Sequence, residues 1–273
     1  MIREKLKYIN HVNEEFDLSA NGVWVEESDL HDYNWKMLLK NRRIAAFYRD
    51  VTTRKLPVVI VCATAEEGLA IRNRLFEVAE KDVLANRYGR LVYGAYHLRC
   101  FITGSEKSSY LISPRHMRTA LSITTDLPVW VRETSYTFLP AAAAARTLDH
   151  SFDYPFDWHS AMDSDQMINT GFTACAFRMV VYGPVTSPAV YVNGHEYKVN
   201  CTVGANEYLT IDSADKTIYR TANDGTQINH FADRSRDQYI FQPIPPGRCT
   251  VTWGEDFKVD IVLLEERGEP KWT

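Results

Sequence analysis

The sequence lacks the cysteine pattern of a disulfide framework or a zinc site. Its five cysteines are scattered, odd in number and never spaced as Cys-x-x-Cys. Small disulfide scaffolds and structural zinc sites both depend on repeated, close cysteine spacings. We therefore expect the cysteines to be small core residues of a protein kept in a reducing compartment.

Local catalytic and metal-binding motifs are missing as well. The eight histidines form no His-x-x-x-His pair, and there is no Gly-x-Ser-x-Gly elbow, phosphate-binding glycine loop or kinase-like set of motifs. A metal site would have to be assembled from distant segments. We expect no enzymatic activity, no catalytic residue, no cofactor and no bound metal.

Neither a surplus of one charge nor a long apolar run is present. Lysine and arginine total 31 against 35 acidic residues, a formal charge of -4. This balance gives no support to nucleic acid or an anionic membrane as the main partner. The first residues lack the apolar run of a signal peptide, and no segment approaches about 20 apolar residues. We expect synthesis in a cytoplasm and no membrane insertion.

What is present is an ordinary globular composition, with 45% hydrophobic and 24% charged residues. A chain of 273 residues can form one large domain or two smaller ones, each with its own core. We expect two domains, residues 1–140 and 141–273. The boundary is placed near Pro140 because an alanine run follows it and an aromatic-rich stretch comes next.

The second domain shows the clearest strand pattern. Asn193-Gly194 lies between two apolar segments and can supply the two positive-φ residues of a type I′ hairpin. A polar loop at 212–215 separates two further strands, and Asp224-Gly225 marks another turn. Apolar and polar residues then alternate at 249–253 and 257–263. This pattern predicts an antiparallel β-sandwich.

The first domain is predicted to be rich in β-strands with one helix. Residues up to 61 are mainly extended, although 32–40 fits a strand or a short helix. The run from Thr64 to Glu67 has the form of a capping box and predicts a helix over 65–85. Beyond it we expect two strands joined at Gly94-Ala95.

The rest of the first domain is predicted to hold further strands. Gly104 to Lys107 is expected to form a turn. A strand pair is then expected over 110–124 and 128–138, joined around Thr125-Asp126.

The predicted helix carries apolar residues on two faces. Helical spacing assigns one set to the core: Leu69, Leu75, Phe76, Ala79 and Val83. Ile71 and Val78 fall on the opposite face. Single exposed apolar residues are common, and the alternative is contact with a neighbouring subunit. Ile71 and Val78 are therefore the candidate subunit-interface residues.

Several aromatic residues offer flat faces on which a sugar could stack: Tyr154, Trp158, Trp253 and Trp272. Such residues more often serve as core or interface anchors, because their burial removes much apolar area from water. Asp153 and Asp157 could in principle form a glycosidase pair, but acids of this kind usually occupy turns. Tyr154, Trp158 and Trp272 remain the candidate contacts for a glycan or a protein partner.

Several segments resemble the distal tail proteins of long-tailed, non-contractile bacteriophages. They are Tyr88-Gly89-Arg90-Leu91-Val92-Tyr93-Gly94-Ala95-Tyr96-His97-Leu98-Arg99-Cys100-Phe101-Ile102, Phe152-Asp153-Tyr154-Pro155-Phe156-Asp157-Trp158, residues 204–213, Ile244-Pro245-Pro246-Gly247 and residues 266–272. Their order also matches the family, so the likeness covers most of the chain. The first 60 residues are the least distinctive part.

This resemblance implies a structural protein at the tail tip of a phage or prophage virion, made in the bacterial host cytoplasm. Residues 1–140 would close into a homo-hexameric, tube-like ring, and residues 141–273 would form a galectin-like sandwich that projects outward. The implied partners are the tail tube protein, the tail-tip lysin or fibre and the receptor-binding protein, with DNA passing through the channel without specific binding. The alternatives are a carbohydrate-binding module that attaches to host surface glycans and, less well supported, a glycan-cleaving enzyme.

Overall fold

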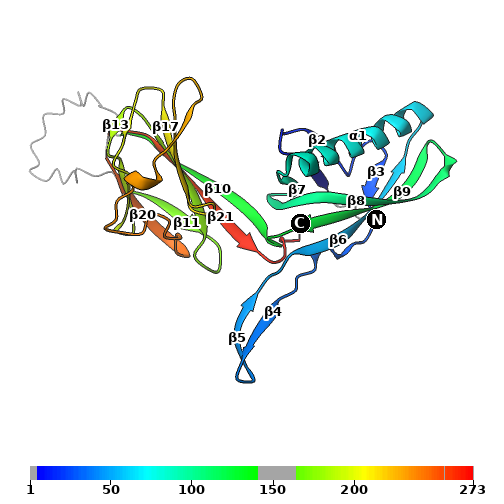
Figure 1. The fold of residues 1–273 in the computed structure, drawn as a ribbon, viewed down its shortest axis with the longest axis horizontal. Helices are drawn as coiled ribbons and strands as arrows, with labels where there is room; N and C mark the ends of the chain where they lie inside the picture. Colours follow the sequence, from blue (N-terminus) through cyan, green and yellow to red (C-terminus); the bar gives the residue numbers. More distant parts are fainter. Residues whose placement is uncertain (1–4, 141–163, 255, 273) are drawn as a thin grey trace, which may run out of the picture. The chain divides into compact units, whose positions relative to one another are not determined.

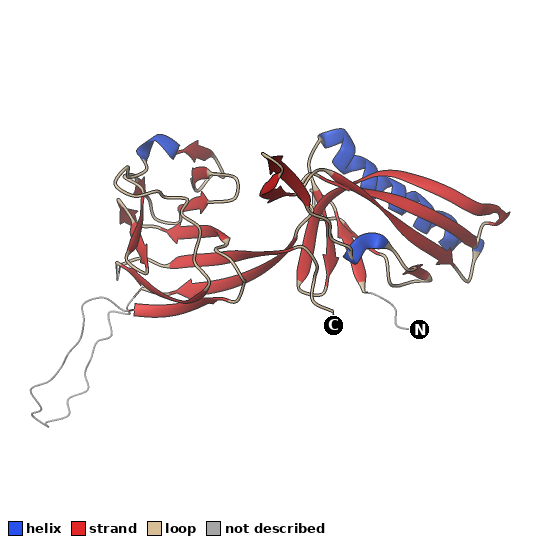
Figure 2. Cartoon of the chain, turned by 90° about the horizontal axis from the view of Figure 1, so that it is seen from below, coloured by secondary structure: helices blue, strands red, loops and turns tan. Residues whose placement is uncertain are grey.

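The computed structural model describes residues 5–140, 164–254 and 256–272. Among these residues, antiparallel strands dominate and α1 (Ala65–Ala85) is the one α-helix (Figure 2). Two short 3-10 helices, η1 (Asp29–His31) and η2 (Phe231–Asp233), accompany it. The mainly β class with a single helix, predicted from the sequence, is confirmed.

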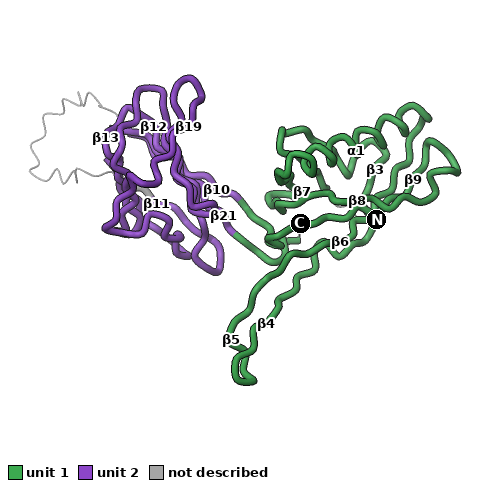
Figure 3. The backbone as a smooth tube through the Cα atoms, viewed as in Figure 1, with its two compact units in different colours: residues 1–132, 266–273 green, residues 133–265 purple. Residues whose placement is uncertain are grey.

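The chain divides into two compact units (Figure 3). Unit 1 comprises residues 1–132 and 266–273, and unit 2 comprises residues 133–265. The division therefore lies at Arg132 and not at Pro140, and the last eight residues belong to unit 1. The reason is that strand β10 (Trp130–Phe138) runs through the boundary. Its first three residues pair with unit 1, whereas Phe138 is buried in the core of unit 2.

Unit 1 is built on nine strands and the start of β10. Their bounds are β1 (Leu6–Ile9), β2 (Glu15–Asp17), β3 (Val23–Val25), β4 (Lys36–Lys40), β5 (Arg43–Tyr48), β6 (Thr52–Val61), β7 (Gly89–Tyr93), β8 (Tyr96–Ser113) and β9 (His116–Thr125). The chain of pairings runs β2-β1-β7-β8-β9-β6-β3, and every pair is antiparallel. Helix α1 lies over one face of these strands (Figure 1). A single apolar core fills the space beneath the helix.

Helix α1 begins and ends where the sequence predicts. The amide of Glu67 donates to Thr64 Oγ1 at 3.2 Å, and the amide of Thr64 donates to Glu67 Oε2 at 3.3 Å. This reciprocal pair satisfies two amides that the first helical turn cannot. At the other end, Asn86 takes a left-handed conformation with φ of 49° and closes the helix.

The buried face of α1 differs from the predicted one. Leu75 and Ala79 are buried as expected, but Leu69, Phe76 and Val83 are exposed. The buried face follows Gly68, Leu75, Val78, Ala79 and Asp82, with Ile71 half-buried beside it. A Cβ at Gly68 would lie 2.3 Å from the Pro114 carbonyl oxygen, so the glycine lets the helix approach the β8–β9 turn closely. Two of the buried residues on this face, Gly68 and Asp82, are not hydrophobic, so an analysis of hydrophobic spacing does not identify the face.

Strand β8 is longer than predicted. Residues 104–107, expected to form a turn, continue the strand, and the turn lies at Pro114-Arg115. The predicted pairing of segment 128–138 with segment 110–124 is also corrected. Strand β10, which covers most of 128–138, pairs with β8 at residues 96–98 and not with β9. The outer half of β8 is largely exposed on both faces. Its sequence therefore shows no apolar alternation from which a strand could be recognised.

Unit 2 contains two large sheets that share one core, and a separate two-stranded pair of β13 and β16. Its strands are β11 (Ser164–Asn169), β12 (Ala176–Tyr182), β13 (Val185–Thr186), β14 (Ala189–Val192), β15 (His195–Lys198), β16 (Thr202–Val203), β17 (Tyr208–Asp212), β18 (Thr217–Thr221), β19 (Gln227–Asn229), β20 (Gly247–Trp253) and β21 (Val259–Arg267). One sheet has the order β19-β18-β17-β12-β21, the other the order β11-β20-β14-β15. Buried side chains from both sheets form one apolar cluster. This is the packing of a sandwich.

The turns predicted for unit 2 are confirmed. Asn193 and Gly194 join β14 to β15 with φ values of 49° and 82°, both positive as a type I′ turn requires. The polar loop after Ile211 joins β17 to β18, and Gly225, with φ of 84°, lies in the turn between β18 and β19. The alternation in β20 and β21 is also confirmed, since Cys249, Val251, Val259 and Ile261 are buried.

Candidate assembly surface

The β4–β5 hairpin is the most exposed apolar element of unit 1. All eleven residues of its two strands are exposed, and in Figure 1 the hairpin projects away from the rest of the unit. Large apolar side chains are frequent in it: Met37, Leu38, Leu39, Ile44, Phe47 and Tyr48. A two-stranded hairpin without a covered face is marginally stable in water. We therefore expect this hairpin to be stabilised by a partner surface.

The register of the hairpin gathers its apolar residues on one face. Met37 pairs with Phe47 and Leu39 with Ile44, and an irregularity follows Leu38. Side chains alternate between the faces of a strand, and a bulge shifts that alternation by one residue on one strand. Met37, Leu39, Ile44 and Phe47 thus lie on the same face. Four large apolar residues on an exposed face are typical of an interaction surface.

The tip and the open end of the hairpin carry its charges. The two turn residues, Asn41 and Arg42, both have positive φ, 51° and 64°. Arg42 is followed by Arg43, and Lys40 lies on the other side of Asn41, so the tip is basic. At the open end, Lys36 Nζ lies 2.5 Å from Asp50 Oδ2. This ion pair is exposed and contributes little to stability.

Sequence reasoning missed this hairpin as a functional element. The segment 32–40 fits a strand or a short helix on its sequence, and the structure shows strand β4 over its second half. A usable signal is present in the sequence: two apolar runs flank Asn41-Arg42 without the polar alternation that a solvated hairpin face would show.

Of the two predicted interface residues on α1, one is corrected. Val78 is completely buried in the core of unit 1, so it does not lie on the outer face of the helix. A charged residue at position 78 would therefore test folding and not association. Ile71 is half-buried and packs against the same core; its contact with another subunit stays a prediction. The exposed apolar residues of the helix are Leu69, Phe76, Val83 and Leu84.

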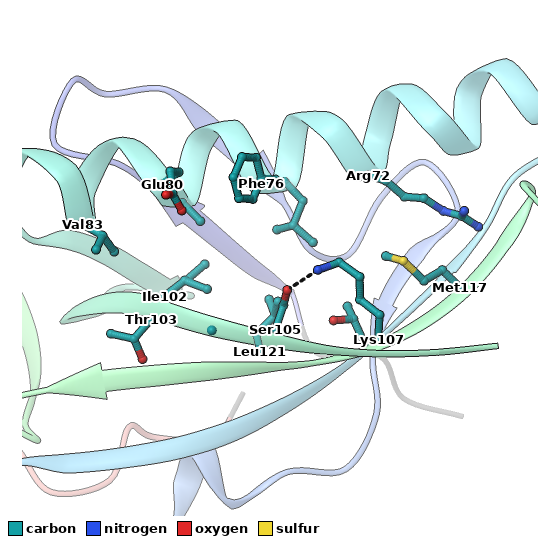
Figure 4. Close-up of a pocket in the computed structure, with 14 residues that line it drawn as sticks. Arg72, Phe76, Glu80, Val83, Ile102, Thr103, Ser105, Lys107, Met117 and Leu121 are labelled. Carbon is teal, nitrogen blue, oxygen red and sulfur yellow. Dashed lines mark hydrogen bonds between the residues drawn. The ribbon is translucent and has the colours of Figure 1, made fainter. Parts of the chain in front are cut away.

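A shallow groove of about 220 Å³ lies between α1 and strands β8 and β9 (Figure 4). Its apolar lining includes Phe76, Val83, Ile102 and Leu121. Its lining residues include no histidine, cysteine or aspartate. Its volume is also smaller than that of a common small-molecule site, which is about 300 Å³ or more.

The two cationic side chains that line this groove, Arg72 and Lys107, form hydrogen bonds with other groups of the protein. The Arg72 guanidinium donates to the carbonyl oxygens of Ser113 and His116 at 3.1 and 2.6 Å. Lys107 Nζ donates to Ser105 Oγ at 2.7 Å, the bond drawn in Figure 4. The Arg72 bonds tie α1 to the β8–β9 hairpin, whereas the Lys107–Ser105 bond lies within β8.

A second cavity of unit 1 lies beside the C-terminal segment. It has a volume of about 760 Å³, and its charged lining residues are Glu27, Asp32 and Glu269. Ser28 and His31 also line it. Ser28 Oγ caps η1 by accepting from the Leu30 amide at 3.4 Å. The His31 ring stacks on Trp272, so both side chains have structural roles.

The aromatic candidates for a glycan contact lie in different places. Tyr154 and Trp158, like Asp153 and Asp157, are outside the described residues. Trp253 is buried, and its indole donates to the Phe257 carbonyl oxygen at 3.2 Å. Trp272 is exposed but belongs to unit 1 and not to the sandwich. The structure therefore does not bring the described candidates together into one site.

Metal-binding clusters are not found in the described part of the chain. No group of three or more His, Cys, Asp or Glu residues there is arranged to hold an ion. The five cysteines are all free, and all except Cys62 are buried. Their predicted role as small core residues is thus confirmed for Cys100, Cys175, Cys201 and Cys249. No helix within the described ranges is both long and apolar enough to span a bilayer.

One buried polar network joins α1 to the first strands. The Asp82 carboxylate accepts from Tyr8 Oη at 2.5 Å and from the His11 amide at 2.8 Å, and His11 Nδ1 lies 2.6 Å from it. Asp82 is completely buried and lines neither of the two cavities described above. We assign this network to the stability of unit 1 and not to a reaction.

Burial of Tyr8 makes unit 1 sensitive to alkaline pH. Burial, then the nearby Cys100 thiol and the hydrogen bond to Asp82, raise the pKa of Tyr8. A raised folded-state pKa contributes stability below the unfolded value of about 10 and loses it as pH rises further. The free energy of unfolding should therefore fall by up to about 1.4 kcal/mol per pH unit above about pH 10.

Denaturant titrations between pH 8 and pH 11 measure this slope. Tyr8→Phe should make the slope shallower, because the unfolded chain then has one hydroxyl fewer to ionise. An identical slope in both chains would show that Tyr8 does not contribute.

Comparison with known proteins shows what the fold resembles. No protein-family model and no curated protein sequence matches the chain. Among solved structures, the SPP1 Dit protein, described as a paradigm of the hub adsorption apparatus in phages that infect Gram-positive bacteria, superposes with a TM-score of 0.59 at 10% identity. The match covers 96% of this chain and 99% of that one.

Two further matches come from the baseplate of phage P2 in its activated conformation, one with calcium and one with strontium. Each has a TM-score of 0.62 at 12% identity and covers 99% of this chain and 100% of the baseplate chain. The superposition therefore includes both units and not one isolated domain. At the level of fold, the resemblance to distal tail proteins noted in the sequence is confirmed: nearly the whole chain has the fold of the SPP1 hub protein and of the phage P2 baseplate chain.

Proposed function

We propose that this chain is a structural protein of a phage tail tip and that unit 1 is its assembling part. The β4–β5 hairpin carries this proposal. It presents Met37, Leu39, Ile44 and Phe47 on one exposed face, and neither apolar core formed by the described residues includes them. Exposed apolar strands invite pairing with another chain, and proteins that remain monomeric suppress them. A hairpin of this kind is suited to permanent assembly.

Closure into a homo-hexameric ring is the form of assembly that we propose. A surface on one copy that fits a different surface on the next copy generates a ring when the rotation closes. The six-fold number and the continuation of a tail tube come from the resemblance to distal tail proteins. Under this proposal DNA passes through the channel without specific binding.

Unit 2 is proposed to be a galectin-like sandwich that projects outward and presents partners. Its two large sheets bury their apolar faces against one another and so form a core of their own. Such a domain can serve as an attachment site for other proteins. The proposed partners are the tail tube protein, the tail-tip lysin or fibre and the receptor-binding protein, at the tail tip of a virion assembled in the host cytoplasm. We assign the chain no catalytic role.

The carbohydrate-binding alternative gains no specific support from the described residues. Trp253 is a core residue of the sandwich, and Trp272 lies in unit 1. Calorimetric titration of the full chain with host-surface glycans measures this alternative directly. Saturable heat would support it, and flat titrations would reject it.

Mass photometry and negative-stain imaging of the full chain over a range of concentrations test the assembly proposal. We expect ring-shaped particles whose mass is six times the 31.4 kDa of the chain. The ring fraction should rise with concentration, since assembly follows mass action. A mass of one chain at every concentration would contradict self-assembly.

A further inference from the structure

The C-terminal segment, residues 266–272, packs against the residues next to the β4–β5 hairpin. We call these residues, Tyr33 and Trp35 before β4 and Arg49 after β5, the root of the hairpin. The indole of Trp272 stacks on the His31 ring, with centroids 4.5 Å apart and planes at 20°. Its Nε1 donates to Glu269 Oε1 at 2.6 Å, which holds the indole in place. His31 is buried and also meets Tyr93 edge to face at 5.0 Å. Trp272 therefore fastens the end of the chain to the residues that precede β4.

The middle of the same segment lies against both sides of the hairpin root. A Cβ at Gly268 would be 3.1 Å from a guanidinium nitrogen of Arg49 and 3.4 Å from Tyr33 Cβ. Tyr33 precedes β4 and Arg49 follows β5, so one backbone segment touches the chain where it enters the hairpin and where it leaves it. A side chain at position 268 would crowd the Arg49 guanidinium, which would have to give way by a few tenths of an ångström, whereas the distance to Tyr33 is that of ordinary van der Waals contact.

Arg49 completes the root by joining the segment to an aromatic ring. Its guanidinium lies 4.2 Å above the centre of the Trp35 ring, a cation–π contact that favours one arrangement of both side chains. Burial lowers the pKa of Arg49, and Glu266 opposes that change. Trp35, Arg49 and the C-terminal segment thus form one packed layer at the base of an otherwise uncovered hairpin.

We propose that residues 266–272 act as a strap that holds the root of the β4–β5 hairpin. No hairpin residue belongs to a core cluster of the described part of the chain, and the exposed Lys36–Asp50 pair holds the hairpin weakly, so packing at the root sets the direction in which it projects. Strand β21 leads directly into the strap. The consequence for ring assembly rests on the proposed function; the strap itself is a property of the single chain.

Hydrogen exchange of the full chain, followed by mass spectrometry below the assembly concentration, tests the strap. Trp272→Ala removes the stacking contact, and Gly268→Leu places a bulky side chain where the backbone now lies close to Arg49 and Tyr33. In both variants, amides of residues 36–48 should exchange at least about tenfold faster, because the root opens locally. Peptides from β8 and β9 should exchange as in the parent chain. Lys271→Ala, an exposed change within the same segment, is the matched control and should exchange like the parent throughout.

Two results would overturn the strap. Unchanged exchange over 36–48 in both variants would show that the segment does not hold the hairpin. Equal acceleration across all of unit 1 would show general destabilisation instead of local positioning.

Ring formation, measured in parallel, separates this inference from the proposed function. A parent chain that never forms rings, combined with faster hairpin exchange in the variants, would refute ring assembly and leave the strap intact. Rings from the parent chain combined with unaltered exchange would refute the strap alone.

Discussion

Replacing Phe47 by aspartate should leave both units folded and abolish ring assembly. Phe47 is 58% exposed, so its loss removes little packing from the single chain. In an assembled ring the same position would lie in the contact, where the new carboxylate would be buried beside the apolar residues Met37, Leu39 and Ile44. Burying an unpaired charge costs several kcal/mol. A loss of about 3 kcal/mol weakens association by more than about a hundredfold.

Mass photometry of the Phe47→Asp variant measures this loss, and circular dichroism verifies that the chain is folded. Phe172→Asp is the matched control, since Phe172 is 82% exposed and lies in unit 2. The same chemical change there should leave ring formation intact. If the Phe47 variant assembles as readily as the control, the hairpin is not the contact, and the exposed apolar residues of α1 become the next surface to test.

Replacing Asp82 by alanine should destabilise unit 1 by roughly 3 kcal/mol or more. The carboxylate is completely buried and accepts from the Tyr8 hydroxyl and the His11 amide. Alanine at this position would leave those donors inside the protein without a partner, and each unsatisfied buried group costs about 1–3 kcal/mol. The effect should exceed that of a typical surface substitution several-fold.

Thermal and urea denaturation measure the Asp82→Ala effect, with Glu77→Ala as the control. Glu77 lies on the same helix but is exposed, so its replacement should change the free energy of unfolding by about 0.5 kcal/mol or less. Similar losses in the two variants would show that the buried network does not stabilise the fold. The network is also closely packed against the backbone. A Cβ at Gly89 would lie 2.3 Å from Asp82 Oδ2 and 2.4 Å from Tyr8 Oη, so a glycine is required at this position.

Local signals in the sequence determined the secondary structure where a few neighbouring residues are sufficient. Thr64 and Glu67 predicted the start of α1 because a capping box is completed within four residues. Asn193-Gly194 predicted a hairpin because its two positive φ angles depend mainly on the two residues themselves. The mainly β class follows from the sum of such signals. The absence of recognisable catalytic motifs is likewise read from the sequence alone.

Tertiary structure alone decided which surfaces are buried and which are available to partners. Val78 is buried and Phe76 exposed because Gly68 lets α1 approach the β8–β9 turn, and no property of the helix sequence by itself fixes that rotation. The unit boundary falls inside β10 because one strand pairs in both units, which composition cannot show. Apolar residues in the β4–β5 hairpin look like core residues in the sequence, since exposure depends on whether another segment of the chain covers them.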